Sequence, residues 1–179
     1  GANMFTSVAA AMCALWGQLH GGANMAVIGM LQDIKQGRET PASVVEKAKE
    51  GRYPLWGFGH RVYRSYDPRV KVLKDACDEL LHAVDASDAL FEIARELEVL
   101  AVKDPYFVER KLYPNLDFYS GILLKAIGIP LDMFTVMFAI GRMPGWIANW
   151  IEGWRHRTRI YRPRQVYVGS TKRPVSPNQ

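Results

Sequence analysis

Apolar residues recur every three to four positions along most of this 179-residue chain, which is the spacing of one face of a helix. Two of the predicted helices open on capping signals, because Thr40-Pro41 and Asp67-Pro68 each place an N-cap residue before a proline at the first helical position. The sequence contains no period-two alternation long enough to predict a strand. It therefore predicts a predominantly α-helical protein, with helices over residues 4–16, between Gly22 and Gly37, and after Pro41, Pro68 and Ser87.

The apolar faces of the later helices can be named residue by residue. The helix after Pro68 is predicted to pack through Leu73, Cys77, Leu80 and Val84. Ser87 is predicted to cap the next helix, which packs through Leu90, Ile93, Ala94, Leu97 and Leu100. Residues 120–140 are almost continuously apolar and are interrupted at Gly128 and Pro130, so we expect two halves packed deep in a helical core. Segment 141–145 is expected to end that stretch, before a separate helix that carries Trp146, Trp150 and Trp154.

Basic residues outnumber acidic ones by 23 to 18, giving a formal net charge of +5. A positive charge suits an anionic small molecule as well as nucleic acid, so its sign does not choose between them. Five of the arginines lie between residues 155 and 164, beside Trp154 and Tyr161. This cluster keeps open a second interpretation, a non-catalytic module that binds nucleic acid through phosphate contacts and stacking.

The two cysteines and the uncharged first 32 residues indicate in which cellular compartment the protein is expected. Cys13 and Cys77 lack a CxxC or histidine-spaced pattern, so we expect no disulfide, no metal site and a reducing compartment. Residues 1–32 carry no formal charge, but polar residues and glycines interrupt them, and their apolar run is too short to cross a bilayer. We therefore expect a cytoplasmic protein, not a membrane protein, whose first helix is buried against other protein.

Three segments place reactive side chains beside glycine or proline turns. His20 precedes two glycines that let backbone and ligand approach closely, although a histidine bonded to backbone at a helix junction has the same pattern. His60 is followed within nine residues by three arginines, which favours a small dianion over a structural histidine in a surface turn. Asp117 lies among aromatic and aliphatic residues, where burial would raise its pKa toward that of a general base; a helix N-cap is an equal alternative. The remaining histidines, His82 and His156, are expected to be solvated.

These segments together resemble the citrate synthase family in their order and spacing, over residues 1–169. The motifs that carry the resemblance are Leu-His-Gly-Gly-Ala-Asn (19–24), Gly-Phe-Gly-His-Arg-Val-Tyr (57–63), Asp-Pro-Arg (67–69), Leu-Tyr-Pro-Asn-Leu-Asp-Phe-Tyr-Ser-Gly (112–121), Gly-Arg-Met-Pro-Gly-Trp-Ile-Ala (141–148) and Arg-Pro-Arg-Gln (162–165). The resemblance implies an all-α, citrate-synthase-like fold. It also implies an acyltransferase that condenses acetyl-CoA with oxaloacetate and hydrolyses the citryl thioester to citrate and CoA. A 2-methylcitrate synthase, which uses propionyl-CoA, remains an alternative.

The family's residue roles carry over by position. The resemblance implies that Asp117 takes a proton from the methyl group of acetyl-CoA, that His20 donates a hydrogen bond to the thioester oxygen, and that His60 polarises the ketone of oxaloacetate. The expected ligands of the oxaloacetate carboxylates, besides His60, are Arg69, Arg142 and, reaching into a partner subunit, Arg162. The expected CoA-binding residues are Leu55, Trp56, Gly57, Phe58, Gly59 and Arg64. No cofactor is implied, since acetyl-CoA is a substrate.

Family members are typically more than twice as long, and the matching part is their C-terminal part. The resemblance implies a large-domain helix (1–22), a small domain (23–121), returning large-domain helices (122–169) and a mobile tail (170–179). A further oxaloacetate-binding histidine of the family has no counterpart here. We therefore expect a fragment, a truncated product or one subunit of a split enzyme, which pairs as a homodimer or larger assembly or with a complementary N-terminal half.

Overall fold

The computed structural model describes residues 1–83 and 89–157, together with residues 159, 164, 166, 168 and 169, but not the side chains of residues 81–83. Within these ranges the regular structure is helical, and one isolated antiparallel bridge joins Phe58 to Pro114. The prediction of an all-α protein is confirmed. The elements are α1 (Met4–Leu15), α2 (Ala23–Lys35), α3 (Pro41–Lys49), α4 (Pro68–Ala83), α5 (Ala89–Lys103), α6 (Pro105–Glu109), α7 (Leu116–Ala126), the short 3-10 helix η1 (Leu131–Met133) and α8 (Phe134–Arg155).

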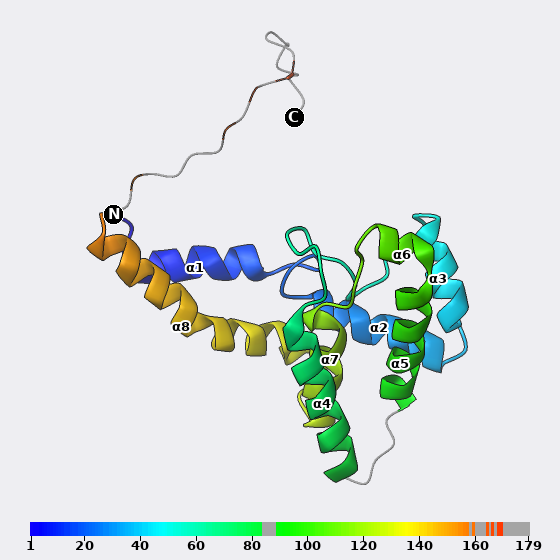
Figure 1. Cartoon of the computed structure of the whole chain (residues 1–179). Coiled ribbons are helices and arrows are strands. Elements are labelled where there is room, and N and C mark those ends of the chain that lie inside the picture. The colour runs from blue at the N-terminus through cyan, green and yellow to red at the C-terminus, as the bar shows by residue number, and fades with distance from the viewer. Residues whose placement is uncertain (84–88, 158, 160–163, 165, 167, 170–179) are drawn as a thin grey trace, which may run out of the picture.

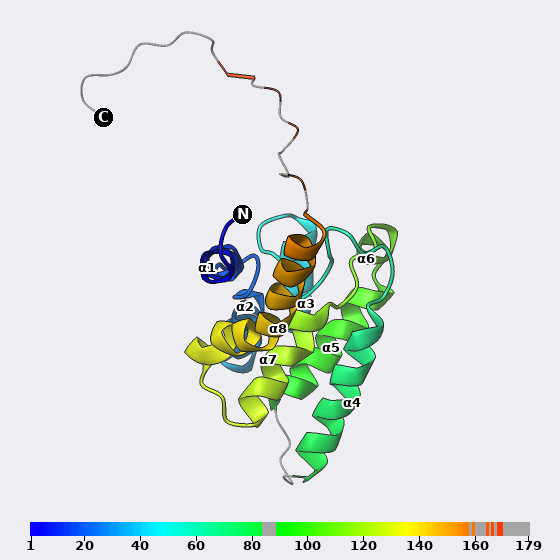
Figure 2. The ribbon, with the colours of Figure 1, turned by 90° about the vertical axis from the view of Figure 1, so that its left-hand side faces the viewer.

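The helices form two groups (Figure 1). Helices α2 to α7 gather into a bundle, and α1 and α8 extend together to one side of it. Helices α1 and α8 contact each other, and α2 contacts α5, α7 and α8. Figure 2 looks nearly along α1 and shows the bundle from the side that α1 and α8 approach. The assignment of these groups to a small and a large domain stays a prediction.

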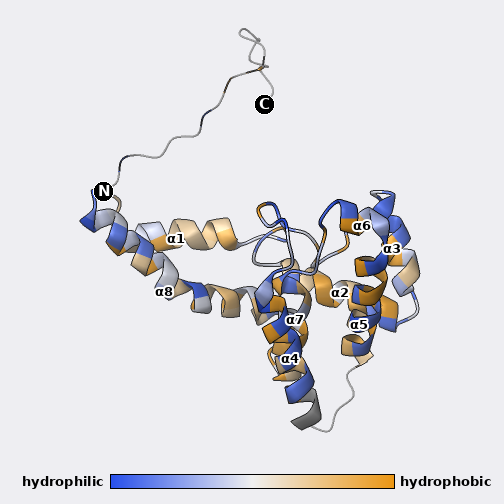
Figure 3. Ribbon diagram, viewed as in Figure 1, coloured by the Kyte–Doolittle hydropathy of each residue, from blue (hydrophilic) through white to orange (hydrophobic). Residues whose placement is uncertain are grey.

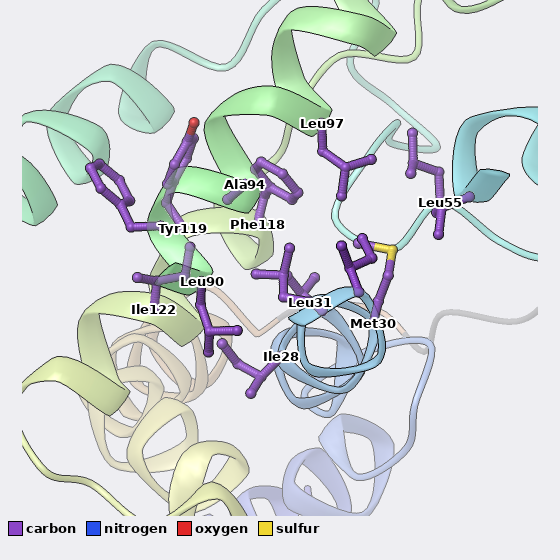
Figure 4. Close-up of a cluster of buried hydrophobic side chains, with 14 of the residues drawn as sticks. Ile28, Met30, Leu31, Leu55, Leu90, Ala94, Leu97, Phe118, Tyr119 and Ile122 are labelled. Carbon is purple, nitrogen blue, oxygen red and sulfur yellow. The ribbon is translucent and has the colours of Figure 1, made fainter. Parts of the chain in front are cut away.

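The core of the bundle is centred on α2 (Figure 4). Ile28 and Leu31 of α2 point into one buried cluster with side chains of α5 and α7. Fully burying a leucine such as Leu31 stabilises a fold by about 1.5–3 kcal/mol. Gly121 of α7 lets the two backbones approach, since a Cβ there would lie 2.9 Å from the carbonyl oxygen of Asn24. This close contact fixes α7, and the residues that precede it, against α2.

Two of the three predicted caps, at Thr40 and Asp67, are present in the structure. The Thr40 side chain accepts a hydrogen bond from the Ser43 amide, and the Ser43 hydroxyl accepts one from the Thr40 amide, so α3 opens on a capping box. The Asp67 carboxylate accepts a hydrogen bond from the Arg69 amide at the start of α4, at 3.0 Å. The cap predicted at Ser87 lies outside the described residues.

Three predictions about packing are wrong. Leu100 was expected on the buried face of α5 but is 37% exposed. The buried face of this helix includes Phe91 and Glu98 instead, so Leu100 lies outside it. The second half of the stretch 120–140 is not packed deep in the core, since Phe134 is the one buried residue of α8.

Segment 141–145 does not end a helix, because α8 continues through Pro144. A proline inside a helix removes one hydrogen bond, here to the carbonyl group of Ile140. Ile140 is 60% exposed, so this lost bond falls at an exposed position of the helix and not in the core.

Large apolar side chains of α1 and α8 face solvent. Phe5 and Trp16 are 80% and 84% exposed, and Leu15 is the one buried residue of α1. Figure 3 shows the apolar character of α1 along its length. The expectation that this helix is buried therefore depends on protein outside the chain and stays a prediction. Among the described residues, no helix is long and apolar enough to cross a membrane.

Candidate active site

The loop between α3 and α4 carries His60 and is pinned to the segment that precedes α7. The Gly59 amide donates to the Tyr113 carbonyl group at 2.8 Å, and the Asn115 amide donates to the Gly57 carbonyl group at 2.8 Å. These bonds are made by backbone groups, so they fix the path of the loop independently of its side chains. His60 thereby lies next to the start of α7.

The hydrogen bonds of His60 define which ring nitrogen carries the proton. Nδ1 accepts from the amides of Val62 and Tyr63, at 3.0 and 3.2 Å. In the neutral ring the proton must then be on Nε2, which makes that nitrogen a donor. The ring stacks on Tyr63, with 3.9 Å between centroids. His60 is thus held by its own loop, as a structural histidine would be, and still presents a donor on an exposed side chain.

Arg69 is oriented by Asp67. Its Nε and Nη2 donate to the two oxygens of the Asp67 carboxylate, at 3.0 and 2.7 Å, and Nη2 also donates to the Tyr63 hydroxyl at 3.1 Å. The hydrogen bond from Arg69 holds the pKa of Asp67 below its ordinary value. Asp67 is buried while half of the Arg69 side chain is exposed, so a fixed guanidinium faces solvent beside His60.

Asn115 joins the two segments that carry Asp117 and His60. Its Oδ1 accepts from the Asp117 amide at 2.9 Å and caps α7, and its Nδ2 donates to the Gly59 carbonyl group at 2.9 Å. Asn115 is therefore the N-cap, and the alternative that Asp117 caps the helix is wrong. Asp117 instead occupies the first turn of α7.

The Asp117 carboxyl group is half-buried, and its oxygens make no hydrogen bond or ion pair with the other described residues. Burial raises its pKa above the ordinary value, and the nearby His20 and His60 act in the opposite direction. The structure thus brings both His20 and His60 within electrostatic reach of Asp117. A raised pKa moves a carboxyl group toward the range in which it can accept a proton from a weak acid.

His20 lies in the turn between α1 and α2. Its Nδ1 is 2.8 Å from the Ala14 carbonyl oxygen, which can only accept, so Nδ1 carries a proton. The turn closes tightly, because the Gly21 amide donates to the Leu15 carbonyl group at 2.8 Å and a Cβ on Gly21 would lie 2.9 Å from that oxygen. The backbone-bonded interpretation of His20 is therefore correct, and Nε2 is left for a ligand.

The start of α8 packs beside the His20 turn. Thr135 donates from its hydroxyl to the Gly21 carbonyl group at 3.0 Å. Phe138 meets the His20 ring edge-on, at 6.5 Å between centroids, and the Arg142 guanidinium lies 5.4 Å from the centre of the Phe138 ring. Phe138 thus lies between His20 and the exposed Arg142 side chain.

Two side chains of the expected CoA-binding segment pack inside the protein. The Leu55 side chain belongs to the core, and Phe58 packs edge-on against Phe118 at 4.8 Å. Gly57 has a φ of +82°, and a Cβ there would lie 2.8 Å from the Phe118 ring, so this turn requires glycine. A ligand could therefore meet the segment only through backbone groups and exposed side chains such as Arg64.

Arg162 lies outside the described residues, as does the side chain of His82. His156 caps the end of α8 and is exposed, as expected. No group of three or more His, Cys, Asp or Glu side chains in the described part of the chain could hold a metal ion.

Sequence reasoning missed two residues that shape this site, Asn115 and Phe138, and it predicted Asp67 as a helix cap without predicting that Asp67 orients Arg69. Asn115 could have been found, because it is a good N-cap residue directly before a helix. Phe138 gave no signal, since an aromatic residue in an apolar helix is typical of a core position. Its place beside His20 and Arg142 depends on how α8 packs.

Similarity to known proteins agrees with this arrangement. The family model described as "Citrate synthase, C-terminal domain" matches residues 1–164. The curated relative Citrate synthase 1 of Mycobacterium tuberculosis is 50% identical over 175 residues, which are 96% of this chain and 41% of that protein. This chain therefore spans less than half the length of that relative.

Solved structures show the same fold. Citrate synthase from the archaeon Thermoplasma acidophilum, solved as a ternary complex with carboxymethyl coenzyme A and oxaloacetate, is 38% identical with a TM-score of 0.81 over 98% of this chain and 46% of that chain. Citryl-CoA lyase from Hydrogenobacter thermophilus is 25% identical with a TM-score of 0.68, over 98% of this chain and 68% of that chain. The chain belongs to the citrate synthase family, and residues 1–164 correspond to its C-terminal domain.

Proposed function

We propose that this chain supplies the catalytic residues of a citrate synthase, which condenses acetyl-CoA with oxaloacetate and hydrolyses the product to citrate and CoA. The observation that carries the proposal is the half-buried Asp117 carboxyl group, with a raised pKa, within electrostatic reach of His20 and His60. The Thermoplasma acidophilum relative was solved with carboxymethyl coenzyme A and oxaloacetate, which supports the same pair of substrate classes.

In the first step Asp117 takes a proton from the methyl group of acetyl-CoA. Negative charge then develops on the thioester oxygen, and a preorganised donor there is often worth about 3–4 kcal/mol. His20 can donate from Nε2 only as an imidazolium while Nδ1 stays bonded to Ala14. A positive His20 also favours the carboxylate form of Asp117, which the base needs.

In the second step the enol carbon attacks the ketone carbon of oxaloacetate. Nε2 of His60 is the protonated nitrogen of the neutral ring, so it can donate to the ketone oxygen as that oxygen becomes a hydroxyl group. The guanidinium of Arg69, fixed by Asp67, suits one carboxylate of the substrate, and Arg142 and Arg162 suit the carboxylates from other segments. Water then hydrolyses the thioester and releases citrate and CoA.

Acetyl-CoA and propionyl-CoA differ by one methylene group. An apolar pocket discriminates such a difference by only about 1–3 kcal/mol, so a 2-methylcitrate synthase is the second candidate. Comparing kcat/KM for the two thioesters decides between them. We place this chain with acetyl-CoA because the similar proteins described above include citrate synthases.

We also propose that protein outside this chain covers α1 and α8, as a second copy of the polypeptide. Ile140, Met143, Pro144, Ile147, Ala148 and Ile151 line an apolar hollow on α8. Phe5 and Trp16 of α1 are exposed as well, and exposed apolar surface of this kind often marks a protein–protein interface. Cys13 is an exposed free thiol, which supports a reducing compartment such as the cytoplasm. Sedimentation of the natural polypeptide should give a dimer or larger assembly, and a monomer would contradict the proposed pairing.

The test of the catalytic proposal is acetyl-CoA-dependent thiol release by the natural polypeptide that contains residues 1–179. Asp117→Ala is expected to lower the rate about 10²–10⁴-fold, because it removes the base. Asp132→Asn is the matched control, since Asp132 is exposed in η1. Unchanged turnover in Asp117→Ala would remove Asp117 from the mechanism.

A further inference from the structure

Glu98 of α5 is a buried carboxyl group that the mechanism above does not use. It is 6% exposed and lies where α4, α5, α7 and the His60 loop meet. A buried carboxylate is costly unless hydrogen bonds or an ion pair compensate for the water it has lost. The hydrogen-bond partners of Glu98 therefore identify the segments that it links.

Three donors converge on the Glu98 carboxylate. Tyr66 donates from its hydroxyl to Oε1 at 2.5 Å, Tyr119 donates to Oε2 at 2.6 Å, and Lys74 of α4 pairs with Oε2. The Lys74 ammonium also lies 5.7 Å from the centre of the Tyr119 ring. Burial alone would raise the pKa of Glu98, but the hydrogen bonds from Lys74, Tyr119 and Tyr66 outweigh it and hold that pKa below its ordinary value. Glu98 is thus a charged acceptor, and its bonds are of the stronger, charge-assisted kind.

Two of these donors adjoin the candidate active site. Tyr66 directly precedes Asp67, which orients Arg69, and its ring lies 5.3 Å from that of Tyr113. Tyr119 is two residues beyond Asp117 on α7. One carboxylate therefore ties the loop of the expected oxaloacetate ligands to the helix of the expected base.

We propose that Glu98 is a positioning residue, whose carboxylate fixes the loop that carries His60 and Arg69 against helix α7. The inference rests on the proposed function, because it assigns that loop to oxaloacetate. Asn115 links the same two segments at the N-terminus of α7 through Gly59, and Glu98 adds a second attachment of the loop through Tyr66, directly before Asp67. With two attachments the loop cannot pivot about either one. Loss of the Glu98 attachment should therefore misplace Arg69 more than His60, which Asn115 still holds nearby.

The experiment compares steady-state kinetics of Glu98→Gln and Tyr66→Phe in the natural polypeptide. Both variants are expected to raise the KM for oxaloacetate about tenfold, because small misplacements of a binding group are costly. The KM for acetyl-CoA should change less than about twofold, since Glu98 does not contact the His20 side of the site. In the double variant the Tyr66 effect should disappear, because its partner is already gone. Tyr106→Phe is the matched control, since the Tyr106 side chain is half-buried on α6, away from this cluster.

A merely structural role gives a different result. If Glu98→Gln lowers the unfolding temperature while the KM for oxaloacetate stays unchanged, the inference is overturned. Should Glu98→Gln not fold, Tyr66→Phe decides alone, because it removes a single hydroxyl group; an unchanged KM there overturns the inference too. Absence of turnover in the unsubstituted polypeptide would overturn the proposed function as well. Normal turnover there, with unchanged KM in the variants, counts against Glu98 only.

Discussion

Asn115 offers the sharpest test of how the site is assembled, because its two side-chain hydrogen bonds can be removed separately. Asn115→Ser keeps a side-chain oxygen that can cap α7, but the serine side chain is too short to reach the Gly59 carbonyl group. Asn115→Ala removes both bonds. The backbone bond from the Asn115 amide to Gly57 remains in each variant.

The magnitudes follow from the two bonds. The N-cap bond to the Asp117 amide, at 2.9 Å, is worth about 0.5–2 kcal/mol. The bond to Gly59, also at 2.9 Å, is worth about 0.5–1.5 kcal/mol net. Asn115→Ser should therefore lower the free energy of unfolding by about 0.5–1.5 kcal/mol, and Asn115→Ala by about 1–3.5 kcal/mol.

Urea unfolding of the natural polypeptide measures both changes. Asn149→Ala is the matched control, since Asn149 is exposed on α8 and bonds only its own helix, and it should change stability by less than about 0.5 kcal/mol. Equal losses for Asn115→Ser and Asn115→Ala would show that the cap contributes nothing. An unchanged stability in Asn115→Ala would refute both bonds.

Three further outcomes are expected. Because burial raises the pKa of Asp117 in the folded state, kcat/KM should fall as pH drops through that raised pKa, and a pH-independent rate would exclude Asp117 as the base. For the same reason the folded protein binds the Asp117 proton more tightly than the unfolded chain does, so lowering the pH through the raised pKa should stabilise the folded protein. Asp117→Asn should therefore unfold at a higher temperature than the natural protein at pH 7. This difference should vanish below the pKa that Asp117 has in the unfolded chain. Gly57→Ala should lower the free energy of unfolding by about 1–3 kcal/mol, because φ is +82° and the added Cβ would meet Phe118. Gly29→Ala in α2 is the matched control and should raise that free energy by about 0.5–1 kcal/mol, because its Cβ would enter open space. Calorimetry that found equal stabilities for the two variants would contradict the close packing of Gly57.

Local signals in the sequence were enough for most of the fold. The caps at Thr40 and Asp67 are short-range hydrogen bonds, so the residues that make them can be recognised in the sequence. Pro144 was misread as a helix end because its cost depends on what the freed carbonyl group can bond, and that depends on exposure. The position of Leu100 was misjudged for a similar reason, since the width of a buried face is set by the neighbouring helices.

For the site, sequence reasoning found the reactive residues but not their supports. His20, His60 and Asp117 stand in motifs whose residue types suit their chemistry. The proton positions on His20 and His60 could not be predicted, because they depend on the carbonyl and amide groups that each ring meets. Glu98 gave no signal either: a glutamate on a helix is ordinarily solvated, and only the packing of α5 brings Tyr66 and Tyr119 to it.

The central claim is that these residues carry a condensation of acetyl-CoA with oxaloacetate. The most direct measurement is mass spectrometry of the product that the natural polypeptide forms from isotope-labelled acetyl-CoA and unlabelled oxaloacetate. We expect citrate that carries the label of the acetyl group, in equal amount to the CoA released, and labelled citrate formed about 10²–10⁴-fold more slowly by Asp117→Ala. CoA release without labelled citrate, or labelled citrate in undiminished yield from Asp117→Ala, would contradict the account.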